Sequence, residues 1–315
     1  MMRTLILEEP VALASPVVTV GTFDGIHIGH ASVIESTIER ARISGGTSVV
    51  VTFDPHPRQF IDPENAPGIL TSFEEKQKRL KDLGLDVLAV VCFDNTLRQM
   101  TPEAFVETFL VGKLKAKTVI VGYDHGFGKD RQGGFETMKN LGNRHGFSVL
   151  SPPAAQVGNK PVSSTRIRKA LERGDLEAVM QLMGRPYPIW GRVVSGDGRG
   201  KSLGFPTANL SFETPGKILP PFGVYAGRVL LDEMYFAVIN YGKRPTFGGR
   251  EACFEVHLLD FSQDIYGQNL ELEICHRIRG ECEFESKEAL VEQIQSDIQT
   301  ARQVFSQSNT TLLRR

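Results

Sequence analysis

The strongest constraint on the fold is the alternation of short β-branched runs with helical patterns through the first 150 residues. Several of these runs are apolar throughout, which is typical of strands in a parallel sheet covered on both faces. The helical segments carry start signals, such as the capping box Ser72-Phe73-Glu74-Glu75. We therefore predict a doubly wound α/β domain. Its expected strands are residues 17–20, 47–53, 86–93, 118–121 and 147–150.

The pattern changes after Gly184-Arg185-Pro186-Tyr187-Pro188, where glycine and proline stop a helix and indicate a linker. Strands separated by Gly, Pro and Asp follow, and a last amphipathic helix begins after Ser286. These features predict a small antiparallel β-barrel or β-sandwich with a polar, disordered tail at residues 306–315. The fold class is thus α/β plus β, with domains at residues 1–184 and 185–315. The expected barrel strands are residues 189–195, 223–230, 234–241, 253–259 and 270–278.

Composition limits the partners and the compartment. A formal net charge of -1 provides no overall positive field, so we expect no nucleic-acid partner. The four cysteines include no C-x-x-C pair, which argues against a zinc framework. No apolar run approaches the ~18 residues of a membrane-spanning helix, and the first residues lack the apolar region of a signal peptide. We therefore expect a cytoplasmic protein that does not act on membranes.

A glycine-rich turn, Gly21-Thr22-Phe23-Asp24-Gly25-Ile26-His27-Ile28-Gly29-His30, follows the strand predicted at residues 17–20. Backbone N–H groups and a helix N-terminus at such a turn favour a phosphate. His27 and His30 are three residues apart, so both can lie on the first helical turn. There, imidazoles can stabilise a transferring phosphoryl group. Two alternatives are a metal site formed by these histidines with Asp24 and an ordinary tight turn.

This turn resembles the G-x-F-D-G-x-H-x-G-H motif of nucleotidylyltransferases, in the form found in bacterial bifunctional riboflavin kinase/FAD synthetases. Residues 53–57 (F-D-P-H-P), 122–128 (G-Y-D-H-G-F-G) and 163–168 (S-S-T-R-I-R) are also similar to that family. The resemblance implies a Rossmann-like domain that transfers AMP from ATP to FMN, giving FAD and pyrophosphate. It implies that His27 and His30 are catalytic, that Gly21, Phe23, Asp24, Gly29, Ser164, Thr165 and Arg168 bind ATP, and that Asp54, Asp124 and Phe127 lie near the flavin.

Two positions depart from the family's pattern, and one segment has a simpler explanation. Thr22 stands where Asn is frequent, and His125-Gly126 replaces an aromatic residue or Arg. These departures concern the flavin contacts more than the ATP contacts. Without the resemblance, residues 163–165 could be only a helix cap, because Ser and Thr are favoured there.

A second glycine-rich segment begins the predicted barrel domain. Gly196, Gly198 and Gly200, together with Lys201, predict a mobile loop whose backbone amides can wrap phosphates, although Gly-Asp-Gly also occurs in hairpin turns. The following Pro206-Thr207-Ala208-Asn209 is similar to the P-T-A-N motif of riboflavin kinases. That resemblance implies that Thr207 and Asn209 coordinate Mg²⁺ and ATP, and oxygen ligands suit this hard cation.

Glu255 is the candidate base of the second domain. Along its predicted strand, Phe254, Val256 and Leu258 face one side and Glu255 faces the other, so it can project into a site. A solvent-facing glutamate is the alternative for an arbitrary strand position. The resemblance implies that Glu255 is the general base that deprotonates the ribityl hydroxyl of riboflavin as this group attacks ATP.

Three hypotheses for the function follow. The first is a bifunctional enzyme that uses ATP and Mg²⁺ to convert riboflavin to FMN and FMN to FAD. The second is an enzyme that retains only one of these activities. The third is an RNA-binding protein, suggested by the letters H-I-G-H of class I aminoacyl-tRNA synthetases and by the barrel. The net charge and the absence of K-M-S-K-S argue against it.

Overall fold

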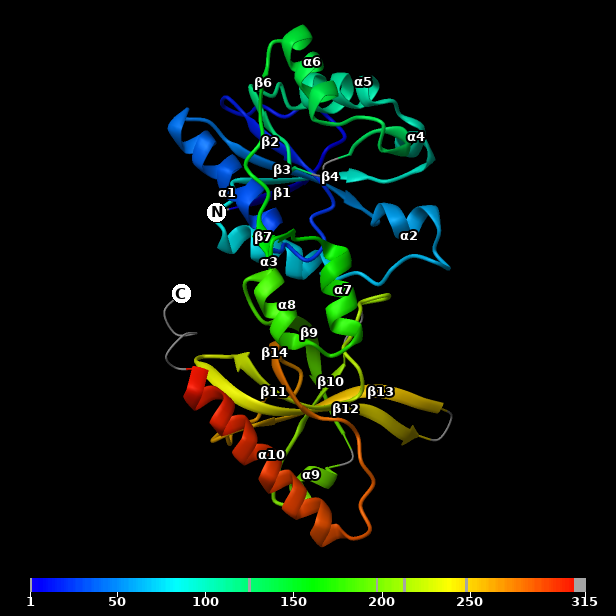
Figure 1. The fold of residues 1–315 in the computed structure, drawn as a ribbon, viewed down its shortest axis with the longest axis vertical. Helices are drawn as coiled ribbons and strands as arrows, with labels where there is room; N and C mark the ends of the chain where they lie inside the picture. The colour runs from blue at the N-terminus through cyan, green and yellow to red at the C-terminus, as the bar shows by residue number, and fades with distance from the viewer. Residues whose placement is uncertain (1, 124–125, 197, 212–213, 247–248, 309–315) are drawn as a thin grey trace. The chain divides into compact units, whose positions relative to one another are not determined.

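The computed structural model describes residues 2–123, 126–196, 198–211, 214–246 and 249–308 (Figure 1). The chain divides into two compact units, Met1–Ser164 and Thr165–Arg315. Helix α8 (Leu176–Met183) packs against strands of the second unit and therefore belongs to it. The domain boundary expected at residues 184–185 stays a prediction.

The first unit contains a six-stranded parallel sheet with the strand order β1-β4-β3-β2-β5-β6. All five predicted strands are present, with ends that differ by at most one residue. The edge strand β1 was not predicted, because its four residues are mostly exposed and include no long apolar run. The strands are β1 (Arg3–Ile6), β2 (Val17–Val20), β3 (Ser48–Asp54), β4 (Val87–Cys92), β5 (Thr118–Ile120) and β6 (Ser148–Leu150).

Helices cover both faces of this sheet, as Figure 1 shows. The capping box is confirmed: Ser72 Oγ accepts from the Glu75 amide, and the Glu75 carboxylate accepts from the Ser72 amide. These helices are α1 (Ile28–Ile43), α2 (Pro57–Ile61), α3 (Phe73–Asp82), α4 (Asn95–Gln99), α5 (Pro102–Phe105), the π-helix η1 (Val106–Lys113), the 3-10 helix η2 (Lys129–Arg131) and α6 (Phe135–His145). A small hairpin, β7 (Gln156–Val157) and β8 (Lys160–Pro161), follows the sheet.

Two hydrophobic clusters lie on the two faces of the sheet. Val49 and Val51 belong to one cluster, whereas Val50 belongs to the other, and all three side chains are fully buried. Because alternate residues of a strand point to opposite faces, this arrangement confirms that the sheet is covered on both sides. The carboxyl ends of β2 and β3 are thereby fixed as neighbours in a rigid scaffold.

The second unit is a closed antiparallel barrel with the strand order β10-β13-β12-β11-β14-β9. Two expectations need correction. Tyr187 and Pro188 are not linker but pair with β14, and β10 forms where only a motif was recognised. The elements are α7 (Ser164–Glu172), α8, β9 (Tyr187–Val194), α9 (Arg199–Ser202), β10 (Ala208–Ser211), β11 (Gly223–Leu230), β12 (Met234–Thr246), β13 (Gly249–Leu258) and β14 (Asn269–Arg279).

The last helix, α10 (Lys287–Ser308), lies along the outside of the barrel (Figure 1). Ser286 caps it through a hydrogen bond from the Ala289 amide to Ser286 Oγ. Asp297 is 2% exposed and accepts hydrogen bonds from the Arg279 guanidinium of β14, with a shortest distance of 2.8 Å. Residues 306–308 belong to this helix, so the predicted disordered tail is wrong there, and residues 309–315 lie outside the described ranges.

Candidate active sites

The glycine-rich turn of the first unit leaves the carboxyl end of β2, next to the end of β3. Three of its residues have φ in the left-handed region: Phe23 at 47°, Gly25 at 93° and Ile26 at 33°. Such a conformation costs a non-glycine residue roughly 1–3 kcal/mol. Phe23 and Ile26 are 4% and 0% exposed, so burial of both side chains holds the turn in this shape. Backbone strain that is fixed by packing is a feature of functional sites.

The two histidines lie together at the start of α1. Their rings stack, with centroids 3.7 Å apart and an interplanar angle of 16°. His27 is the N-cap, and its Nδ1 accepts a hydrogen bond of 3.2 Å from the His30 amide. A neutral His27 therefore carries its proton on Nε2. The predicted side-by-side arrangement is confirmed.

Glycine at position 29 permits this arrangement. A Cβ there would lie 3.2 Å from both Cε1 and Nδ1 of His27, which would push the ring from its position. Similarly, a Cβ on Gly21 would lie 3.0 Å from the Phe23 ring. Both glycines thus allow close packing of neighbouring rings, and their predicted contacts with ATP stay predictions.

Asp24 connects the turn to the segment that precedes α3. Its Oδ1 accepts hydrogen bonds from the amides of Leu70 at 2.8 Å and Thr71 at 3.0 Å, and the side chain is 4% exposed. In addition, the Gly25 amide donates to Thr71 Oγ1 at 2.9 Å. The carboxylate therefore shapes the turn, and a direct contact with ATP stays a prediction.

Lys76 also contacts the end of β2, a feature that motif reasoning missed. Its Nζ donates to the Thr22 carbonyl oxygen at 2.8 Å and to Thr52 Oγ1 at 3.2 Å. The residue is 6% exposed. Burial lowers the pKa of this ammonium to about 8, and the Asp24 and Asp54 carboxylates partly oppose the lowering. One signal was available: Lys76 precedes the fully buried Leu80 by four residues, which places it on the apolar face of α3.

The remaining predicted residues of the first site lie in different environments. Ser164 Oγ donates to the Asp24 carbonyl oxygen at 2.9 Å, so the start of the S-T-R segment lies at the motif turn. Asp54 is exposed at the end of β3, whereas Phe127 is 6% exposed and packs with Phe105 in the core. Asp124 and His125 lie outside the described residues. Thr165 is exposed and Arg168 is buried, both in the second unit.

In the second unit, the glycine segment folds directly against the P-T-A-N motif. A Cβ on Gly196 would lie 1.7 Å from Asn209 Nδ2, and one on Gly200 would lie 3.0 Å from Thr207 Oγ1. The Phe205 amide donates to the Gly200 carbonyl oxygen at 2.8 Å. The described part of this segment includes the short helix α9, and its mobility stays a prediction.

Glu255 lies between two asparagines in neighbouring strands. It is in register with Asn209 of β10 on one side and with Asn240 of β12 on the other. Asn240 Nδ2 donates to Glu255 Oε2 at 3.2 Å. Phe254 and Val256 are buried, whereas Glu255 is only half-buried. The predicted orientation away from the core is therefore confirmed, and Asn240 is a neighbour that sequence reasoning did not assign.

His257, two residues further along β13, anchors the P-T-A-N segment. Its Nδ1 lies 2.8 Å from the Pro206 carbonyl oxygen, so this nitrogen carries the proton and donates. Its ring also makes an edge contact with Phe205, at a centroid distance of 5.9 Å. No local sequence pattern links this residue with Pro206, which is 51 residues away.

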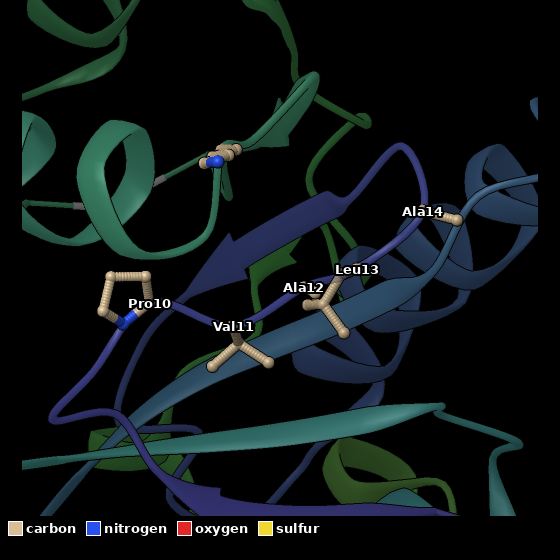
Figure 2. A pocket seen from close by; sticks show the side chains of 6 residues that line it. Pro10, Val11, Ala12, Leu13 and Ala14 are labelled. Atoms are coloured by element: carbon tan, nitrogen blue, oxygen red, sulfur yellow. The ribbon is translucent and has the colours of Figure 1, made fainter.

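Figure 2 shows a separate surface hollow of about 550 Å³, lined by residues 10–14 and Lys115. The Ala14 carbonyl oxygen accepts a hydrogen bond from the Thr47 amide, immediately before β3 begins. The hollow therefore reaches the amino ends of the strands, whereas the motif turn leaves their carboxyl ends. It contains none of the predicted site residues.

The described residues also bear on the metal alternative and on membrane association. Within the described ranges, no group of three or more His, Cys, Asp and Glu residues is placed to hold a metal ion. The alternative metal site at His27 and His30 thus gains no support from this part of the chain. Among the described helices, none is long and apolar enough to cross a bilayer.

The sequence matches the FAD synthetase family over residues 10–166 and the riboflavin kinase family over residues 183–305. Two relatives are bifunctional riboflavin kinase/FMN adenylyltransferases. That of Haemophilus influenzae is 39% identical over 290 residues, covering 91% of this chain and 94% of the relative. That of Bacillus subtilis is 37% identical over 308 residues, covering 96% and 95%.

A solved structure is also similar over nearly the whole chain. It is described as a macrolide-efflux protein from Streptococcus pneumoniae and is 32% identical, with a TM-score of 0.85. The match covers 95% of this chain and 98% of that one. This likeness and the two family matches confirm the predicted α/β plus β fold.

Proposed function

The chain belongs to the bifunctional riboflavin kinase/FMN adenylyltransferase family, and from this premise we propose how its residues divide the two reactions. The barrel unit transfers the γ-phosphoryl group of ATP to riboflavin and forms FMN. The parallel-sheet unit then transfers AMP from a second ATP to FMN and forms FAD and pyrophosphate. The protein is a transferase that acts on these small molecules, and we place it in the cytoplasm without a nucleic-acid partner.

In the phosphorylation step, Glu255 accepts the proton of the ribityl hydroxyl. The hydroxyl oxygen forms a bond to the γ-phosphorus, and the bond from that phosphorus to the bridging oxygen of ADP breaks. The hydrogen bond from Asn240 orients the Glu255 carboxylate, and the register with Asn209 sets this carboxylate beside the predicted phosphate site. A positioned base contributes about 10² to 10⁴ in rate.

Thr207 and Asn209 are the residues that would hold Mg²⁺ in this unit. Their hydroxyl and amide oxygens are suitable hard ligands. The close approach of Gly196 and Gly200 leaves no room for a Cβ beside them, so backbone amides can come near the phosphates. When bound, Mg²⁺ supplies charge neutralisation at the phosphate oxygens. Gly198 and Lys201 are the further ATP contacts that we propose for this segment.

In the adenylylation step, a phosphate oxygen of FMN attacks the α-phosphorus of ATP, and the bond to pyrophosphate breaks. The stacked pair His27 and His30, at the N-terminus of α1, donates to the phosphates and stabilises the developing charge. Ser164, whose hydroxyl contacts the same turn, fixes the adjacent segment. Asp54, exposed at the end of β3, is proposed to lie near the flavin.

The arrangement of Glu255 between Asn209 and Asn240 is the observation that best supports this proposal. The experiment supplies riboflavin, ATP and Mg²⁺ and separates FMN and FAD by chromatography. We expect Glu255→Gln to slow FMN formation by about 10² to 10⁴ while supplied FMN is still converted to FAD. Conversely, His30→Ala should accumulate FMN and slow FAD formation by about 10² to 10³.

Glu271→Gln is the matched control, because Glu271 is another half-buried strand glutamate between buried leucines. It should form FMN at the parental rate. Mixing the Glu255→Gln and His30→Ala proteins should restore conversion of riboflavin to FAD, since FMN can diffuse between intact sites. Unchanged phosphorylation by Glu255→Gln would contradict the proposed base, and no rescue on mixing would contradict two independent sites.

A further inference from the structure

Lys76 is a buried cation that donates hydrogen bonds both to the turn after β2 and to strand β3. Its Nζ and the Thr52 hydroxyl form a triangle with the Thr22 carbonyl oxygen. Lys76 donates to both partners, at 2.8 Å and 3.2 Å, and Thr52 Oγ1 lies 3.4 Å from the same carbonyl. Thr22 is the second residue of the motif turn after β2, and Thr52 lies in β3 two residues before Asp54. One side chain from α3 thus fixes the ends of both strands.

This placement is energetically unusual. A buried ammonium is costly unless a counter-ion pairs with it, and here both hydrogen-bond acceptors are neutral. An ordinary core position on α3 would be satisfied by an apolar side chain, as at Leu80 on the same helix. Strongly perturbed buried groups next to a site are candidates for a functional role. The charge therefore needs an explanation beyond packing.

We propose that Lys76 is a positioning residue for adenylyl transfer. Its ammonium fixes the carboxyl ends of β2 and β3. The His27–His30 pair and the Asp54 loop can then receive ATP and FMN in a productive geometry. The inference rests on the adenylylation proposed above. The positive charge of Lys76 also balances the nearby Asp24 and Asp54 carboxylates, so anionic substrates meet a turn with less net negative charge.

The test compares Lys76→Gln, which retains a donor without the charge, with the parent. Lys81→Met is the matched control, because Lys81 is an exposed lysine in the same helix. The kcat and both KM values for FAD formation are measured from supplied FMN and ATP, between pH 6.5 and pH 9.5. For Lys76→Gln we expect kcat to fall about 10- to 100-fold, because misplacement by about 1 Å costs that much, with smaller changes in KM.

The pH profile separates positioning by charge from a purely structural role. Burial lowers the pKa of Lys76 to about 8, so parental kcat should fall above that pH as the ammonium loses its proton. The same decline should be absent in Lys76→Gln. FMN formation from riboflavin, a reaction of the other unit, should remain parental in every variant.

Parental kcat in Lys76→Gln, or a parental kcat that stays constant up to pH 9.5, would overturn the inference. If proteolysis shows that Lys76→Gln is unfolded, Thr52→Val is the variant that tests the proposal. It removes the Thr52 hydroxyl, one of the two acceptors of Lys76, at nearly constant side-chain volume. It should lower kcat about 3- to 10-fold, and parental activity would overturn the proposal. A parent protein that makes no FAD at all would instead contradict the proposed function.

Discussion

The buried ammonium of Lys76 should make the first unit more stable as the pH rises from 7 to 9. In the folded chain its pKa is about 8, whereas its ordinary value is 10.5. Between these values the unfolded chain binds more protons than the folded one, so the free energy of unfolding increases with pH. At about 1.4 kcal/mol per pKa unit, complete relief amounts to about 3 kcal/mol, of which roughly 1 kcal/mol falls between pH 7 and pH 9.

The assay is urea unfolding followed by a brief protease pulse, with peptides of residues 2–123 quantified by mass spectrometry. Parent and Lys76→Met are compared at pH 7 and pH 9, so that other titrating groups cancel in the difference. We expect the parent to gain about 1 kcal/mol relative to the variant. An unchanged difference, or a relative loss by the parent, would show that the ammonium is not desolvated as its burial indicates.

Two further predictions concern the barrel unit. Gly196→Ala should slow FMN formation by at least about 10²-fold, because its Cβ would lie 1.7 Å from Asn209 Nδ2. Gly280→Ala is the control and should form FMN at the parental rate, because its Cβ would meet only Arg277 Nη2, at 3.8 Å. Equal rates in the two variants would refute this reason. Asp297→Ala should lower the free energy of unfolding by about 2–4 kcal/mol, measured by urea titration with Trp190 fluorescence, since it leaves the partly buried Arg279 without its carboxylate partner. Asp260→Ala, which removes the exposed pair with Arg302, should leave the free energy of unfolding nearly unchanged, and a similar loss in both would argue against the distinction.

The predictable parts of this fold are those specified by local sequence. The Val17–Val20 strand and the capping box of Ser72 and Glu75 depend on neighbouring residues, and both are present as expected. By contrast, β10 consists of Ala208–Ser211, whose polar residues carry no strand pattern. It forms because β9 and β13 pair with it on either side. Whether such a segment forms a strand depends on its pairing with strands that are distant in the sequence.

The same distinction applies to the sites. His27 and His30 are three residues apart, so their stacking follows from helical geometry and could be anticipated. Lys76 finds its acceptors 54 and 24 residues away, at Thr22 and Thr52, so only the fold reveals them. Asp24 combines both levels. Its motif position predicts a contact with ATP, which stays a prediction, whereas the hydrogen bonds that its carboxylate accepts from the backbone of Leu70 and Thr71 depend on the fold.

The hydrogen bond from Ser164 to the Asp24 carbonyl has a consequence for synthesis of the chain. Its two ends are 140 residues apart. At a translation rate of about 5–20 residues per second, the motif turn emerges from the ribosome roughly 7–28 s before Ser164 can reach it. During that interval the turn at Phe23 and Ile26 lacks this contact. The hydrogen bonding of the motif turn in the nascent protein is therefore completed only when the last residue of the first unit has been made.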